Sequence, residues 1–441
     1  MLICRGRMPT PIFVVRCYAF YSVMACVLIA LIAGSMPARV AFAEQVLPLT
    51  LQEAEELALY DEPGQNSYLS HAEALRDESV SGGQLPDPTM SIGMINYPIQ
   101  SGGFTTEGMT QAQLAIRQVF PGGDTRELTA EKFHSLASEM THKADGRGRD
   151  VLSKVRIAWL ETHFWRDAHQ IALDSRPFFD DLVTTTRSLY SVGRKNQQDV
   201  LRAELELVRL DDRIIDMSRQ HSRARAVLSE WVGKDSARPV APKLPDWTAV
   251  PPLEVLHENL QSHPALMAAD AGVGASLTGI ELARQEYKSD WALDVAYGYR
   301  DGYLANGDAR SDFVSVSVTF DLPFFRGNRQ DRSLDAALSE RRAADQSREE
   351  VVRRLASQLQ AEYVRWQDLG KRLDLYQRMI LDVSADNARA ALAAYQSDAG
   401  DFADVMRAYV DDLDTRLDYI RLRVERAQSY ALLANLGGIS R

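Results

Sequence analysis

Two short segments of the chain alternate between large apolar residues and small or polar ones. In Trp291–Tyr299 the odd-numbered positions are large and apolar, while the even-numbered positions are alanine, aspartate or glycine. In Phe313–Phe320 valine and phenylalanine alternate with serine and threonine. A period of two residues predicts strands with two chemically different faces. The segments Thr89–Tyr97 and Thr110–Val119 alternate less cleanly and are predicted to be the corresponding strands of the first half.

The apolar positions of these strands form one face of the predicted sheet. Four strands are too few for a soluble sheet to bury so many aromatic residues, whereas outer-membrane barrel strands share this alternation and are about 9–11 residues long. The pattern therefore favours contact with lipid on this face and water on the other. The predicted lipid-facing residues are Trp291, Leu293, Val295, Tyr297, Val314, Val316, Val318 and Phe320. The pattern leaves one alternative open, a four-stranded sandwich packed on helices.

A helical period follows each pair of predicted strands. Apolar residues recur at steps of three and four at Val352, Leu355, Leu359, Tyr363, Trp366, Leu369, Leu373, Tyr376, Ile380 and Val383. This narrow seam, with charge elsewhere, is typical of coiled-coil packing. A helix from about Asn328 to Tyr395 would be about 100 Å long, and its first-half counterpart, Asp124 to Tyr190, is expected to be interrupted at Pro177. Such helices need similar helices beside them, so they predict a rod, a hairpin array or a tube.

The chain contains two similar halves. A shift of 205 places residues 190–203 on residues 395–408, with Tyr, Asp-Val and Arg-Ala at matching positions. Each half is predicted to contain a short helix, two strands and a long helical hairpin. The predicted repeats are residues 44–237 and 253–441, and the Pro-rich stretch 238–252 is predicted to be the linker between them.

The first 43 residues have the pattern of a secretory signal peptide. They contain four arginines but no lysine or acid, then the apolar run Cys17–Ala33, and they end in Ala41-Phe-Ala43, which suits a signal peptidase. A retained membrane anchor and a lipoprotein cut before Cys26 are the two alternatives. All three cysteines of the chain lie in this segment. The exported chain is therefore predicted to have no disulfide, thiolate metal site or cysteine nucleophile.

Charge and composition narrow the possible chemistry. The net charge of −11 argues against binding nucleic acid through a basic surface. The sequence has no G-x-S-x-G or H-E-x-x-H motif, and its carboxylates are spread over the long predicted helices as solvated faces. The eight histidines do not occur at ligand spacing. We therefore expect no enzymatic activity, no cofactor and no bound metal.

Several short motifs occur in a fixed order along both halves. They are Leu49–Ala58 (LTLQEAEELA), Leu85–Pro88 (LPDP), Gln118–Gly123 (QVFPGG), Val318–Pro323 (VTFDLP), and the two Tyr…Asp-Val-x-x-Ala segments that begin at Tyr190 and Tyr395. With these motifs the mature chain resembles the TolC-like outer-membrane efflux channel family over nearly its whole length. The LPDP and QVFPGG motifs are most similar to the branch that serves heavy-metal and cation efflux pumps.

The resemblance implies an α+β membrane protein. Three protomers with four strands each would form a twelve-stranded outer-membrane β-barrel, continued by a long periplasmic α-helical coiled-coil barrel. A homotrimer would also close the sheet edges that four strands leave open. The implied partners are a periplasmic adaptor (membrane fusion) protein, an inner-membrane efflux pump and outer-membrane lipid. The implied function is passive conduction of substrates, metal cations among them, from the pump to the exterior.

The resemblance also implies a periplasmic gate, which in this family consists of aspartate rings and an interhelical lock. A ring aspartate falls on Asp404 and the lock tyrosine on Tyr395. A second ring aspartate would fall on Arg407 and a lock arginine on Gly400, so the chain departs from the family at both positions. A ring of Asp404 would favour cations, although a helix N-terminus also stabilises an aspartate at that place. The candidate pore-entrance and hairpin-tip residues are Asp398, Asp401, Arg194 and Lys195.

Two other functions compete with the channel. A periplasmic coiled-coil scaffold or adaptor explains the helices but not the aromatic residues of the strands. A nutrient porin explains the strands but leaves the long helices without a role.

Overall fold

The computed structural model describes residues 47–439. The predicted signal peptide, its cleavage pattern and the alternative lipid attachment at Cys26 lie outside the described residues. Within the described part, no helix is both long enough and apolar enough to cross a membrane.

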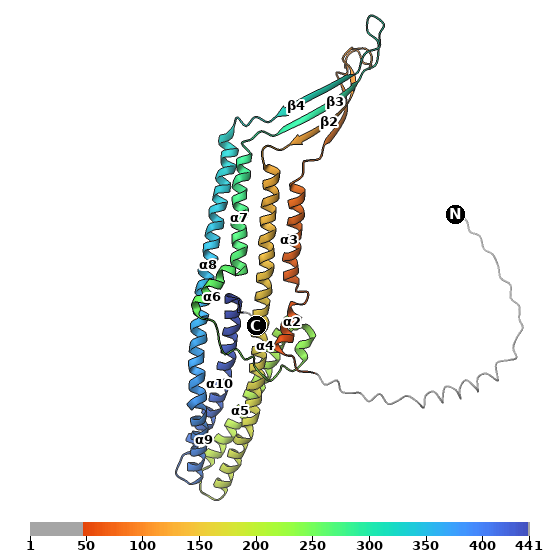
Figure 1. The fold of residues 1–441 in the computed structure, drawn as a ribbon. Helices are drawn as coiled ribbons and strands as arrows, with labels where there is room; N and C mark the ends of the chain where they lie inside the picture. The colour runs from red at the N-terminus through yellow and green to blue at the C-terminus, as the bar shows by residue number, and fades with distance from the viewer. Residues whose placement is uncertain (1–46, 440–441) are drawn as a thin grey trace, which may run out of the picture. The chain divides into compact units, whose positions relative to one another are not determined.

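The same order of elements occurs twice (Figure 1). The first set is α2 (Leu51–Leu59), α3 (Pro63–Gly82), β1 (Thr89–Ile95), β2 (Gln111–Phe120), α4 (Thr125–Ser191) and α5 (Gln197–Val232). The second set is α6 (Leu253–Asn259), α7 (Pro264–Gln285), β3 (Trp291–Tyr299), β4 (Phe313–Phe320), α8 (Gln330–Leu375), α9 (Leu381–Gln396) and α10 (Phe402–Gly437). The strands lie at one end of the helices, and the turns of the two long hairpins lie at the other.

Two helices precede each strand pair, so the expectation of a single short helix was wrong. The second of them is 20 residues long in α3 and 22 residues long in α7. Both begin at a proline, whose fixed φ suits the first helical position and whose missing N–H costs nothing there. Glu62 caps α3 by accepting a hydrogen bond from the Gln65 backbone N–H at 2.5 Å. The proline and the capping residue start a second helix, although the hydrophobic pattern alone predicted only one helix before the strands.

The N-terminus of α7 is capped by a buried histidine. The His263 Nδ1 atom accepts a hydrogen bond from the backbone N–H of Ala265 at 3.2 Å, which requires an unprotonated Nδ1. Burial lowers the pKa of His263 to about 4. Since the unfolded chain has the ordinary histidine pKa of about 6.5, it binds more protons below that pH than the folded chain does. Above pH 6.5, His263 therefore does not lower the free energy of unfolding. As the pH drops from 6.5 toward 4, the free energy of unfolding falls.

This histidine predicts a pH effect on stability. We expect the free energy of unfolding to fall by about 3 kcal/mol per copy between pH 6.5 and pH 4 through His263. His263→Asn keeps a cap acceptor that does not titrate, so it should remove this part of the pH dependence. The measurement is denaturant unfolding in detergent across this pH range, with the exposed His71→Asn as control. Equal pH profiles for His263→Asn and the parent protein would contradict the prediction.

The four strands form one antiparallel sheet in the order β1-β2-β3-β4. The bounds of β3 and β4 confirm the predicted segments, and β2 is displaced by one residue from its predicted segment. β1 ends two residues before its predicted end at Tyr97. Among the described residues β1 pairs only with β2, and β4 pairs only with β3, so both are edge strands.

The long helix α4 continues through Pro177, so the predicted interruption was wrong. Proline removes one helical hydrogen bond and crowds the preceding turn, which destabilises an isolated helix. Here the next two turns bury Phe179, Leu182 and Val183 in the main core cluster. Tertiary packing directly after the proline therefore maintains the helix.

The predicted seam along α8 is confirmed over most of its length. Leu355, Leu359, Leu369 and Leu373 are buried. The prediction fails at the end of the seam, because Tyr376–Ile380 forms a π-helical turn between α8 and α9. The extra residue in such a turn rotates the following residues around the helix axis. Val383 is consequently exposed.

The main core cluster lies around the middle of α4 and includes residues of both halves. Trp159 is buried there, and its Nε1 donates a hydrogen bond to the Leu49 carbonyl at 3.0 Å. Leu49 in turn forms a parallel bridge with Val240 in the Pro-rich stretch 238–252. Arg166 donates from Nη1 to the Val240 carbonyl at 2.7 Å. The stretch predicted as a linker is thus attached to α4.

Candidate functional site

One face of the sheet is apolar and exposed across all four strands. The strand register pairs Trp291 with Phe320 and Val295 with Val316, so the eight predicted lipid-facing positions of β3 and β4 share this face, and all of them except the half-buried Leu293 are exposed. The face continues over the first half through Met90, Ile92, Met94, Leu114 and Ile116, which are also exposed. Those five residues were not predicted, because their alternation is weaker and only the pairing of β1 with β2 and of β2 with β3 places them on the same face.

The two long hairpins end in turns of the same geometry. Gly193 in the α4–α5 turn and Asp398 in the α9–α10 turn both have a left-handed backbone, with φ of 72° and 67°. The Gly193 N–H donates to the Tyr190 carbonyl at 2.9 Å, and the Asp398 N–H donates to the Tyr395 carbonyl at 3.2 Å. Aspartate tolerates this conformation better than most residues. The two turns therefore differ in side chains rather than in backbone.

An ion pair joins the two turns. Lys195 Nζ lies 2.7 Å from Asp398 Oδ1, although the two residues come from different hairpins. The hydrogen bond from Lys195 lowers the pKa of Asp398 and raises the pKa of Lys195, so both are charged at neutral pH. The ammonium also lies 4.6 Å from the centroid of the Tyr395 ring. Sequence reasoning selected all three residues but did not predict that they form one cluster.

Tyr395 is the buried part of this cluster. Its side chain is only 1% exposed, and its ring packs edge-on against Phe402 at a centroid distance of 5.8 Å. Burial raises the pKa of Tyr395. The two remaining tip candidates, Arg194 and Asp401, are exposed. Tyr395 therefore packs inside one protomer, where it links α9, α10 and the opposite turn.

Asp404 lies apart from this cluster, in the first turn of α10. Its exposed carboxylate is 3.4 Å from Arg407 Nη1, one helical turn further on. Arg407 thus compensates part of the Asp404 charge. The helix N-terminus adds a further favourable field for the carboxylate.

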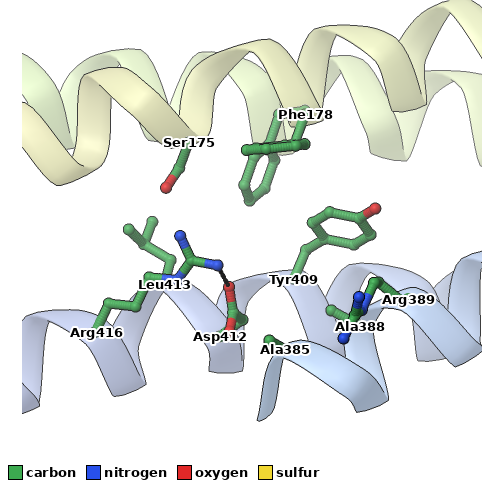
Figure 2. A pocket seen from close by; sticks show the side chains of 10 residues that line it. Ser175, Phe178, Ala385, Ala388, Arg389, Tyr409, Asp412, Leu413 and Arg416 are labelled. Atoms are coloured by element: carbon green, nitrogen blue, oxygen red, sulfur yellow. Dashed lines mark ion pairs between the residues drawn. The ribbon is translucent and has the colours of Figure 1, made fainter. Parts of the chain in front are cut away.

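A cavity of about 340 Å³ lies between α4 and the α9–α10 hairpin. Figure 2 shows Phe178 on one side and Tyr409 on the other, with the Asp412–Arg416 ion pair beside them. The carboxylate and guanidinium of this pair are 2.8 Å apart. The cavity thus combines an aromatic wall with an ion pair, and sequence reasoning did not identify it. Residues 47–439 contain no group of three or more His, Cys, Asp or Glu residues that could hold a metal ion.

Comparisons with known proteins agree with these features. Residues 255–438 match the family described as Outer membrane efflux protein. The protein CyaE of Bordetella pertussis (strain Tohama I) is 25% identical over 420 residues, which cover 90% of this chain and 86% of CyaE. The sequence similarity therefore spans both halves.

Solved structures share the fold over both halves as well. The outer-membrane channel OprN matches with a TM-score of 0.73 at 18% identity, covering 88% of this chain and 90% of OprN. The outer membrane protein VceC from Vibrio cholerae matches with a TM-score of 0.74 at 15% identity, covering 88% of this chain and 96% of VceC. With its exposed apolar sheet and paired helical hairpins, the chain is similar to outer membrane efflux proteins: residues 255–438 match that family, and OprN and VceC share the fold over both halves.

Proposed function

We propose that three copies of this chain form a channel across the outer membrane. The channel passively conducts substrates delivered by an inner-membrane pump and a periplasmic adaptor. The observation that carries the proposal is the sheet, which exposes an apolar face and has two unpaired edges among the described residues. Lipid would cover the face, and edge-to-edge pairing of three sheets would close a barrel of twelve strands.

The helices support assembly side by side. On α5 the exposed residues Leu201, Leu205, Val208 and Ile215 follow helical spacing. On the α8–α9 segment Leu375, Met379 and Val383 form a second exposed apolar stripe. Exposed stripes of this kind are typical of helices that pack against other helices. We assign them to contacts between neighbouring protomers of the helical barrel.

Membrane fractionation with chemical cross-linking tests the assembly. We expect a cross-linked trimer that partitions with the outer membrane and needs detergent for extraction. N-terminal sequencing of that material should begin at Glu44, since the proposal includes removal of residues 1–43. A soluble periplasmic monomer or dimer would contradict the proposal and favour the scaffold. Loss of nutrient uptake on deletion, with toxic-compound resistance unchanged, would favour the porin.

We extend the proposal to metal cations as cargo. The support is the similarity of the LPDP and QVFPGG motifs to the heavy-metal and cation branch. The cargo is released rather than stored, so the proposal assigns no chelating site to the described residues. Deletion should lower the tolerated concentration of metal salts more than that of toxic organic compounds. The reverse order would restrict the channel to organic substrates.

We propose that Asp404 forms a ring that attracts cations at the periplasmic end. Asp404→Ala should weaken block of single-channel current by divalent cations by about threefold, because three carboxylates near the pore are lost. Arg407→Ala should strengthen the block, since it removes the guanidinium beside each carboxylate. The measurement is planar-bilayer recording at low ionic strength. Unchanged block in both variants would place Asp404 away from the pore.

A further inference from the structure

The four strands contain only two charged residues, and these two face each other. They are Arg117 on β2 and Asp294 on β3. The register pairs them directly, and Arg117 Nε lies 3.9 Å from Asp294 Oδ1. All other strand residues are apolar, small or uncharged polar. The charge of the sheet is therefore concentrated in one cross-strand pair.

The pair lies on the face opposite the apolar one. The register places it in a row that runs from Thr89 through Arg117 and Asp294 to Ser317. The Thr319 hydroxyl on the same face lies 3.5 Å from Asp294 Oδ2. The Arg117 side chain is 47% exposed and that of Asp294 is 26% exposed. Both charged groups therefore reach the open space on this side of the sheet.

The contribution of the pair to stability is small. Exposed ion pairs and opposite charges paired across strands each contribute no more than about 1 kcal/mol. A charge placed within a membrane-spanning segment would, in contrast, be costly on the lipid side. The main effect of the pair is therefore the electric field that it creates on its side of the sheet.

We propose that Arg117 and Asp294 form a charged layer in the lumen of the barrel and set its charge preference. This inference rests on the proposed function, since closing three sheets with the apolar face outward turns the pair inward. The closed barrel then carries three guanidinium and three carboxylate groups, alternating around the lumen in one layer. The charges balance, so neutralising either residue exposes three charges of the other sign to passing ions.

Reversal potentials across a salt gradient test the layer. In about 0.1 M KCl, Asp294→Asn should raise the anion-to-cation permeability ratio by about twofold, and Arg117→Gln should lower it by about twofold. The double variant should return close to the parent value. All differences should nearly vanish in about 1 M salt, where the Debye length is about 3 Å. Gln113→Asn on the same face changes no charge and should have no effect.

Ser317→Cys provides a second route if the charge variants fail to assemble. Ser317 lies in the same row as the pair, and the three native cysteines all lie in the first 43 residues. A cationic thiol reagent should raise the anion preference of this variant, and an anionic reagent should raise its cation preference. Val316→Cys, on the apolar face, should not respond to either reagent.

The charged layer and the proposed channel function can fail separately in these experiments. Channels that conduct normally but show no change of permeability ratio in any of these variants would overturn the charged layer and leave the channel intact. A parent protein that forms no channel would overturn the proposed function, and the layer with it.

Discussion

Replacing Val316 with arginine should remove most of the assembled trimer from the outer membrane. Val316 lies near the middle of β4 on the apolar face, where it is 66% exposed within one protomer. An arginine facing lipid near the bilayer centre costs about 2–4 kcal/mol. Three copies would carry this cost together, which is comparable with the whole stability of many folded proteins. Membrane fractionation and cross-linking yield measure the loss.

Ser315→Arg is the matched control. Ser315 immediately precedes Val316 and lies on the opposite, polar face of β4, where the added charge would meet water in the lumen. We expect this variant to assemble with a yield near that of the parent protein. Equal yields for Val316→Arg and Ser315→Arg would mean that the apolar face does not contact lipid.

Replacing Arg156 with leucine should destabilise the protein by about 3–5 kcal/mol. Arg156 Nε lies 2.6 Å from Glu55 Oε1, and the two side chains are only 10% and 4% exposed. The substitution removes the guanidinium that compensates the charge of a buried carboxylate. It also removes the contact of Arg156 with the Trp247 ring, whose centroid lies 5.5 Å away. Thermal and denaturant unfolding in detergent measure the loss.

An exposed pair supplies the comparison. Arg187 and Glu204 are 2.6 Å apart, but their side chains are 62% and 38% exposed. Arg187→Leu should therefore cost less than about 1 kcal/mol. The double variant Glu55→Leu with Arg156→Leu should recover much of the stability, because no buried charge remains. A loss below 1 kcal/mol for Arg156→Leu alone would mean that other groups compensate Glu55.

The strands and long helices could be predicted because their signals are local. In a strand, every second residue lies on the same face. In a packed helix, the buried residues recur every three or four positions. The positions of β3 and β4 and the buried leucines of α8 follow directly from these periods. Predictions failed at Pro177 and at Val383, where packing and a π-helical turn override the local preference.

The candidate sites depended more heavily on tertiary structure. The resemblance selected Tyr395, Asp398 and Lys195 one by one, yet their contact depends on how two hairpins lie beside each other. Arg117 and Asp294 carry no local signal at all, since each is a single charge within a separate strand. Only the pairing of β2 with β3 makes them neighbours.

The sequence alone determined the duplicated order of strands and long helices, the apolar face of the second strand pair, and the family resemblance. These features depend on periodicity and on short motifs, which are local along the chain. The tertiary structure decided the continuity of α4, the extension of the apolar face over β1 and β2, and the partners of Lys195, Arg117 and Glu55. Each of these ion pairs joins residues far apart in the sequence, so the pair forms and contributes to stability only when the elements pack together.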